Sequence, residues 1–237
     1  MKVATNIIIK ILLDFYYISG TFLDITKENC IMPDTKISIS KGNDKLGSIC
    51  NISLPPIVTC PKNTPCSKRC YARRIYVRRP VVRKAWNKNL KLYQDDPNAY
   101  FQLLDQHLKK SKLTHFRFHV SGDIPDKNYF IKMLQVVDNN KDIKFLVFTK
   151  RFDLLKDFNQ RRNNLSIVLS MWPGMQVGEE VFRSFPKAWV YDKNNIDDRI
   201  PANVSQCNSN CQTCDGGKGK NCWSLYETKQ DVVFHIH

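Results

Sequence analysis

The sequence has no long uninterrupted apolar segment and no clear secretion signal. Its main apolar stretch near the amino terminus, residues 6–20, is broken by Lys10 and Asp14 and is too short to cross a bilayer. No small-residue cleavage site clearly follows this stretch, so we interpret it as a packed helix or strand. These absences predict an intracellular protein that does not enter a membrane.

Acidic residues are also scarce. The chain of 237 residues holds 22 Asp and Glu against 37 Lys and Arg, which gives a formal net charge of +15 and a pI near 9.4. Such an excess favours an anionic partner such as nucleic acid, although solubility alone would also explain it. The hydrophobic content of 42% is enough for one sizeable core, so we predict a single domain over residues 1–237.

Within this domain we expect an N-terminal extension (1–48), a β/α core (49–200) and a cysteine-rich C-terminal segment (201–237). A short strand is predicted at Ile57–Thr59. A helix over residues 75–93 should be kinked or divided by Pro80, and a second helix should begin after Asp96, its N-cap. The apolar face of that second helix is expected to hold Tyr100, Leu103, Leu104, His107 and Leu108.

Strands and helices then alternate along the chain. The apolar patterns predict helices at 128–137 and 152–158, and strands at 115–120, 143–148, 165–170, 187–192 and 232–237. Such alternation is typical of a parallel sheet built from βα units. The expected fold class is therefore α/β, with a parallel sheet that is open or closed into a partial (βα) barrel, a cysteine-rich loop before it and a cysteine-rich appendage after it.

Polar residues follow several of these strands, at the expected carboxyl edge of the sheet, where reactive groups collect in parallel folds. The candidates for substrate or cofactor binding are Ser121, Asp123, Thr149, Lys150 and Arg151. Asp123, Lys150 and Arg151 are the candidate catalytic residues. The alternative is ordinary strand-end capping, in which Asp123 caps a helix that begins near Pro125.

His119 is a weaker candidate ligand. It alternates with Arg117 and His115 along the predicted strand, opposite two phenylalanines, so these three side chains could form one polar face that points into a barrel or a cluster pocket. A structural role for the histidine is the simpler interpretation.

Nine cysteines, an odd number, in a chain without a secretion signal make disulfides the weaker explanation. Eight of them fall into two sets. Cys207, Cys211, Cys214 and Cys222 have C-x3-C-x2-C-x7-C spacing, with only one short pair, which favours an iron–sulfur cluster, such as [4Fe–4S], over zinc. Cys50, Cys60, Cys66 and Cys70 have C-x9-C-x5-C-x3-C spacing, in which Cys50 is either a fourth ligand or a packing residue. Cys30 is interpreted as a small buried hydrophobe.

Several motifs resemble, in order, those of the bacteriophage gene product 88 family of viral and plasmid proteins. They are the run SLPPIVTCPKNTPCSKRCYA (53–72), FHVSGDIP (118–125), FLVFTKR (145–151), LSMWPG (169–174) and the last cysteines before VVFHIH (232–237), so the resemblance covers about residues 45–237. The family is in turn remotely similar to radical S-adenosylmethionine enzymes. This similarity implies a partial barrel with a cluster at Cys60, Cys66 and Cys70, and S-adenosylmethionine as a cofactor.

The cysteine spacing departs from that of the radical enzymes. Their usual C-x3-C-x2-C ligands are matched only by residues 207–214, after the strands, whereas the earlier loop has C-x5-C-x3-C. A cluster that cleaves S-adenosylmethionine also needs one iron without a protein ligand, and Cys50 as a fourth ligand would block it.

Three functions are consistent with these patterns. The first is a radical-type or other redox enzyme that needs an electron donor and, given the viral resemblance, works in the host cell or is packed into particles. The second is a nucleic-acid-binding protein with structural or sensing clusters, which would use Arg73, Arg74, Arg78, Arg79, Arg83 and Lys84 with interleaved Tyr71, Tyr76 and Trp86. This run could equally be a solvated helix face or offset the charge of a cluster. The third is a zinc-stabilised binding module.

Overall fold

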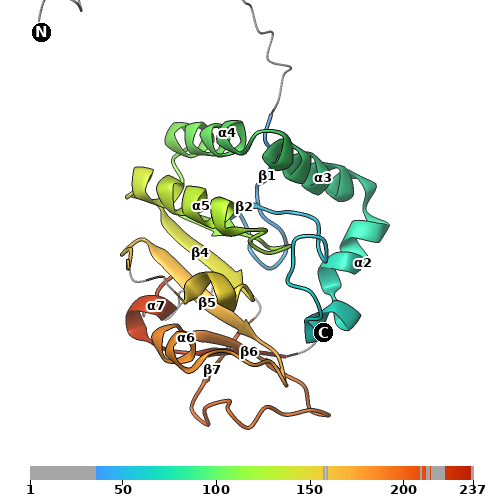
Figure 1. The fold of residues 1–237 in the computed structure, drawn as a ribbon, viewed down its shortest axis with the longest axis vertical. Helices are drawn as coiled ribbons and strands as arrows, with labels where there is room; N and C mark the ends of the chain where they lie inside the picture. Colours follow the sequence, from blue (N-terminus) through green and yellow to red (C-terminus); the bar gives the residue numbers. More distant parts are fainter. Residues whose placement is uncertain are drawn as a thin grey trace, which may run out of the picture. The chain divides into compact units, whose positions relative to one another are not determined.

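A computed structural model describes residues 36–156, 158, 160–208, 210–211, 214 and 222–235 (Figure 1). Predictions for the stretch at 6–20 and for Cys30 lie outside these residues. The described residues build one eight-stranded sheet in the order β1-β2-β3-β4-β5-β6-β8-β7. The strands are β1 (Ile39–Ser40), β2 (Cys50–Ile52), β3 (His115–Phe118), β4 (Lys144–Thr149), β5 (Leu165–Met171), β6 (Lys187–Tyr191), β7 (Ser205–Gln206) and β8 (Val232–His235).

The sheet is parallel except at one edge, where β1 pairs with β2 in the antiparallel direction. The α/β class and the mainly parallel sheet are therefore confirmed. The sheet is not closed into a barrel, because β1 and β7 are its two edges and do not pair with each other. The crossovers hold the helices α2 (Tyr71–Arg78), α3 (Pro80–Asp95), α4 (Pro97–Lys110), α5 (Lys127–Asn139), α6 (Glu179–Ser184) and α7 (Leu225–Thr228), and the 3-10 helices η2 (Pro65–Arg69) and η3 (Phe152–Leu155).

The helix boundaries follow local chemistry. Pro80 divides the predicted helix into α2 and α3, because proline cannot donate the backbone hydrogen bond that would continue α2. The Asp96 carboxylate accepts hydrogen bonds from the backbone of Asn98 and Ala99 and so caps α4 as predicted. Asp126, rather than Asp123, caps α5 through the backbone N–H of Tyr129.

Three sequence predictions are wrong in detail. Residues 57–59 form a turn rather than a strand, since Ile57 has a left-handed φ of 69°. The strand β3 stops at Phe118, because His119 has a φ of 57°. On α4 the buried face includes Phe101 rather than His107, which is exposed.

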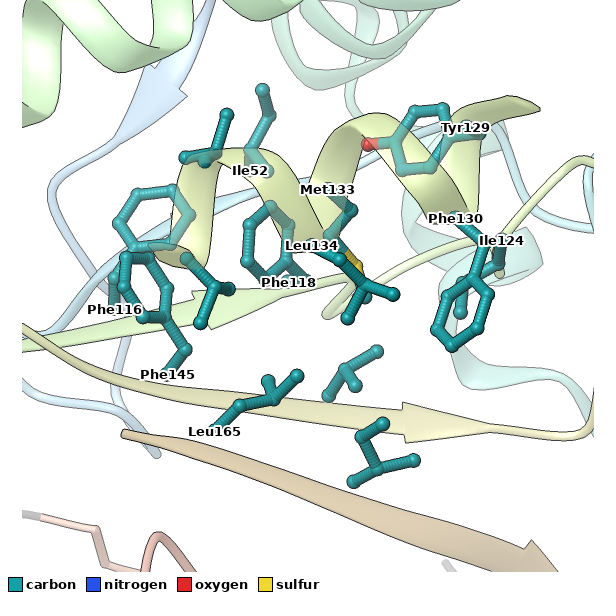
Figure 2. Close-up of a cluster of buried hydrophobic side chains, with 14 of the residues drawn as sticks. Ile52, Phe116, Phe118, Ile124, Tyr129, Phe130, Met133, Leu134, Phe145 and Leu165 are labelled. Carbon is teal, nitrogen blue, oxygen red and sulfur yellow. The ribbon is translucent and has the colours of Figure 1, made fainter. Parts of the chain in front are cut away.

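The main core lies between one face of the sheet and the helices. Figure 2 shows α5 laying Tyr129, Met133 and Leu134 over Phe116, Phe118 and Phe145 of the strands below. These strand residues are fully buried, and burying each large side chain stabilises the fold by about 2 kcal/mol. The alternation of β3 explains this arrangement, because its two phenylalanines point to one face and His115 and Arg117 to the other.

The second face of the sheet has a smaller apolar cluster. Leu146, Val168, Ala188 and Val232 come from four parallel strands, and the C-terminal segment covers them with Trp223 and Leu225. The side chains of Cys207, Cys211 and Cys222 pack against the same cluster. The last part of the chain thus brings cysteines to the face of the sheet opposite the main core.

A buried amide ties α3 to the first two strands. Asn89 is fully buried; its Oδ1 accepts from the N–H of Ser38 at 2.8 Å, and its Nδ2 donates to the carbonyls of Ser38 at 2.8 Å and Ser53 at 3.1 Å. The Asn89 side chain therefore supplies the hydrogen bonds that a neighbouring strand would otherwise give to the residue before β1 and to the segment after β2.

Replacing Asn89 with alanine should destabilise the protein by about 3 kcal/mol, because three backbone groups lose their partner in a buried position. The denaturant midpoint of unfolding measures the loss. Lys88→Ala on the exposed side of the same helix is the control, with an expected change within about 0.5 kcal/mol. Equal midpoints for the two variants would contradict the assigned role.

Candidate metal centre

The first cysteine loop follows β2 and lies at the carboxyl edge of the sheet. Cys60 sits in a turn, Cys66 lies within η2, and Cys70 is the N-cap of α2, its Sγ accepting from the N–H of Arg73 at 3.4 Å. All three thiols are half-buried. Pro65 starts η2 and the cap starts α2, so the loop is built from short, separately terminated turns.

The loops after β2 and β3 are bound closely to each other. The N–H of Leu54 donates to the carbonyl of Ser121 at 3.1 Å, and the N–H of Asp123 donates to Oγ1 of Thr59 at 3.2 Å. Gly122, with a φ of 75°, fits between them: a Cβ there would lie 2.5 Å from Oγ1 of Thr59 and 2.9 Å from the carbonyl of Leu54. The sequence motif at residues 121–123 thus positions the segment that leads to Cys60.

Two of the three candidate catalytic residues make structural contacts. The buried Asp123 carboxylate accepts from Oγ1 of Thr149 at 2.7 Å and from the backbone N–H groups of Lys150 and Ile124, both at 2.8 Å. Burial nevertheless raises its pKa. The guanidinium of Arg151 donates to the carbonyls of Ile124 and Pro125 and pairs with Asp153.

Lys150 is the candidate whose charge reaches the cysteine loop. Burial raises the pKa of the Cys60 thiol to about 11, and the charge of Asp123 adds to the rise while Lys150 opposes it. The same lysine lies near the hydroxyl of Tyr71, whose pKa is raised by burial and by the neighbouring Cys70 and Cys60 and lowered by Arg117 and Lys150. That hydroxyl donates to the carbonyl of Val120. The charge of Lys150 therefore acts on both Cys60 and Tyr71 of this part of the chain.

Cys50 lies apart from this loop. It occupies the first position of β2, at the amino end of the strand, and its side chain packs against the main core together with Ile39. Burial raises its pKa, and the charge that opposes this rise is that of Lys41. The loop with Cys60, Cys66 and Cys70 lies at the opposite end of the strand.

The C-terminal cysteines gather on the second face of the sheet. The N–H of Cys207 donates to the carbonyl of Val233 at 2.9 Å, and the N–H of Cys211 to that of Lys45 at 2.8 Å. Burial raises the pKa of Cys222 to about 12, with smaller contributions from Cys207, Cys214 and Cys211. All four thiols therefore lie near enough to one another to interact electrostatically.

Arg117 of β3 faces this second set. Its charge opposes the rise in the pKa of Cys211 and Cys222, and its guanidinium lies 4.7 Å from the ring centre of Phe148. Asn51 is the direct β2 neighbour of Arg117 in the sheet. Nδ2 of Asn51 and Nε of Arg117 are both buried donors with no hydrogen-bond acceptor among the described residues.

His119 does not continue the polar face of β3. Its ring packs on Phe118 and Tyr129, on the side of the main core. Burial lowers its pKa to about 3, with a further contribution from Arg117, so the imidazole is neutral at physiological pH. Both ring nitrogens are buried without a partner among the described residues, as is Oγ of Ser121.

The described residues hold no group of three His, Cys, Asp or Glu side chains in a geometry that could bind a metal ion. Their eight cysteines are thiols rather than disulfides. Sequence reasoning missed Asn51 and Tyr71 as neighbours of the two cysteine sets. The polar Asn51 between Cys50 and Ile52 was the available signal, but it required knowing that these residues form a strand.

The basic residues predicted to contact nucleic acid separate into two groups. Arg83 donates to the carbonyls of Tyr76 and Val77 and so stabilises the end of α2. The rings of Tyr76 and Trp86 stack on each other at 6.3 Å, which joins α2 to α3. The other predicted residues, Arg73, Arg74, Arg78, Arg79 and Lys84, are exposed.

Gly122→Ala should destabilise the protein by at least about 3 kcal/mol, because the added Cβ collides with the cysteine loop and the backbone is left-handed. Gly174→Ala is the matched control. Its φ is 80°, but a Cβ there has no atom within 4 Å, so about 1 kcal/mol is expected. Denaturant unfolding of both variants measures the difference, and equal losses would show that the loop does not depend on the close contact.

Comparison with known proteins identifies a family. The sequence model of the Gene product 88 family aligns with residues 32–218, which is most of the chain and includes the first cysteine loop. No curated protein and no solved structure matches the chain. Among the helices of the described residues, none is long and apolar enough to span a membrane.

Proposed function

The chain belongs to the Gene product 88 family, and we propose that it is an iron–sulfur protein. Its C-terminal cysteines, Cys207, Cys211, Cys214 and Cys222, hold one cluster against the second face of the sheet. The observation that supports this most directly is the pair of buried donors, Nδ2 of Asn51 and Nε of Arg117, that have no acceptor among the described residues beside these thiols.

Buried donors of this kind indicate an anionic ligand. Leaving a buried polar group without a hydrogen bond costs about 1–3 kcal/mol, and here two such groups lie side by side on β2 and β3. Thiolates and the sulfides of a cluster accept hydrogen bonds, and such bonds tune its redox potential. The Arg117 guanidinium would also offset the negative charge that four deprotonated cysteines bring into an apolar site.

We propose a second cluster at Cys60, Cys66 and Cys70. Three protein ligands leave one iron of a cubane open to a substrate or to a cofactor such as S-adenosylmethionine, and a redox reaction there would need an external electron donor. Lys150 lies near this loop and is the side chain we assign to binding an anionic group of that ligand. Thiols persist in this form inside cells, so we assign the activity to the infected cell.

The test is iron, zinc and acid-labile sulfide analysis, with visible spectra, on protein purified without oxygen. The wild-type protein is expected to be brown and to contain iron and sulfide. Cys211→Ser with Cys222→Ser should remove the iron of the C-terminal set, and Cys60→Ser with Cys66→Ser that of the first set. Cys50→Ser is the control and should keep the full iron content, because Cys50 lies at the other end of β2.

Two outcomes would contradict the proposal. Colourless protein with zinc and no sulfide would indicate a zinc-stabilised binding module. Loss of iron from the Cys50→Ser variant would show that Cys50 is a ligand. The first cluster would then have four protein ligands and no iron open to a substrate or cofactor.

Arg117→Met should lower the midpoint potential of the C-terminal cluster by about 60 mV, equivalent to about 1.4 kcal/mol for a one-electron couple, because a nearby positive charge favours the reduced cluster. Arg117→Lys should restore part of the shift. Arg161→Met is the control, since Arg161 also packs on an aromatic ring, that of Tyr226 at 5.2 Å, but is exposed. Electron paramagnetic resonance during redox titration measures the potentials. Equal midpoint potentials in the Arg117→Met and Arg161→Met variants would contradict the role assigned to Arg117.

A further inference from the structure

The positive charge of the chain is concentrated in one stretch. Residues 45–94 contain no Asp or Glu and twelve Lys or Arg, out of a net charge of +15 for the whole chain. This stretch runs from β2 through the first cysteine loop to α3. Solubility does not require such a segregation, because interspersed charges of both signs serve it as well.

Few of these charges are paired. Within the described residues, the carboxylate partners of this stretch are Asp192, which binds Arg69 at 2.9 Å, and Asp95, which binds Lys91 at 2.8 Å. Arg74 and Arg78 lie four residues apart on α2, where like charges destabilise a helix. An eight-residue helix that keeps such a pair without a carboxylate is best explained by an anionic ligand that neutralises it.

The unpaired charges surround a cleft. Arg73, Arg74 and Arg78 line a surface cleft of about 470 Å³, together with Lys68, Arg69 and Cys70. The cleft has the volume of a small-molecule site, enough for about one nucleotide of a longer strand. Arginine predominates, and its planar guanidinium binds phosphate oxygens in pairs, which lysine cannot do.

Apolar side chains are exposed around the same helices. Val77 is 63% exposed, Val81 82% and the residue Tyr71 as a whole 45%, whereas the rings of Tyr76 and Trp86 stack on each other. Duplex DNA or RNA would present only its phosphates and grooves to these residues. Unpaired bases, in contrast, have flat faces that pack on aromatic and aliphatic side chains.

We propose that the cleft and the adjoining surface of α2 and α3 bind single-stranded nucleic acid. The phosphates contact Arg73, Arg74 and Arg78, and bases pack on Tyr71 and Val77. A strand bound there passes beside Cys70, at the edge of the first cysteine loop. Binding itself does not depend on the presence of a cluster, so this inference is tested independently of the iron–sulfur proposal.

The experiment titrates the full-length protein into a fluorescein-labelled oligothymidine and follows fluorescence anisotropy at several salt concentrations. The triple variant Arg73→Gln, Arg74→Gln, Arg78→Gln should bind at least about tenfold more weakly, and the slope of log K against log salt should fall by about 2, because three phosphate contacts are lost. Circular dichroism checks that the variant is folded, and iron is measured on the same samples.

The control removes three positive charges at the opposite, amino edge of the sheet. The control variant carries the triple substitution Lys110→Gln, Lys112→Gln, Lys144→Gln. These lysines are exposed and lie before β3 and at the start of β4. Their replacement should change the affinity for the oligonucleotide by no more than about twofold. Equal weakening by both triple variants, or no binding by the wild-type protein at low salt, would overturn the proposal. Tighter binding of a duplex would overturn the assignment to single strands, and tighter binding of polyglutamate would point instead to an acidic protein.

Discussion

The buried Asp123 holds together the loops on which the first cysteine site depends, through both its carboxylate and its backbone N–H. Its oxygens bind the loop after β4 through Thr149 and Lys150, and its backbone N–H binds the loop after β2 through Thr59. The three loops come from neighbouring parallel strands, whose carboxyl ends meet at one edge of the sheet. Without this carboxylate the loop after β3, which binds the turn next to Cys60, would lose its hydrogen bonds to the loop after β4. A residue that looked catalytic from its position after a strand is thus first a structural one.

The sequence predicted the regular part of the fold well. Each of the predicted strands after residue 140 lies within two residues of an observed strand, because buried parallel strands are continuous apolar runs. The helix divided at Pro80 and the cap at Asp96 followed from proline and aspartate chemistry alone. The two-residue strands β1 and β7 and the short helix α6 escaped prediction, because segments of two to six residues have too little periodicity to be detected.

The sequence predicts which cysteines belong to each candidate site, but it does not predict where each set lies in the fold or which residues surround it. Spacing separates Cys207–Cys222 from the earlier loop, yet nothing in the sequence assigns the C-terminal set to the second face of the sheet. That assignment depends on the pairing of β8 with β6, which brings the end of the chain against strands that lie much earlier in the sequence. Cys50 shows the opposite problem: it is near Cys60 in sequence, but β2 separates them in space.

Arg117 connects the two cysteine sets. Its charge acts on the thiols of Cys211 and Cys222 on the second face, and also on the hydroxyl of Tyr71, which in turn lies near Cys60 and Cys70. A positive charge between two anionic centres lowers the repulsion between them, which would otherwise oppose binding of both. Clusters at the two proposed sites would lie on either side of the half-buried Arg117 side chain, and each would use only the cysteines of its own set.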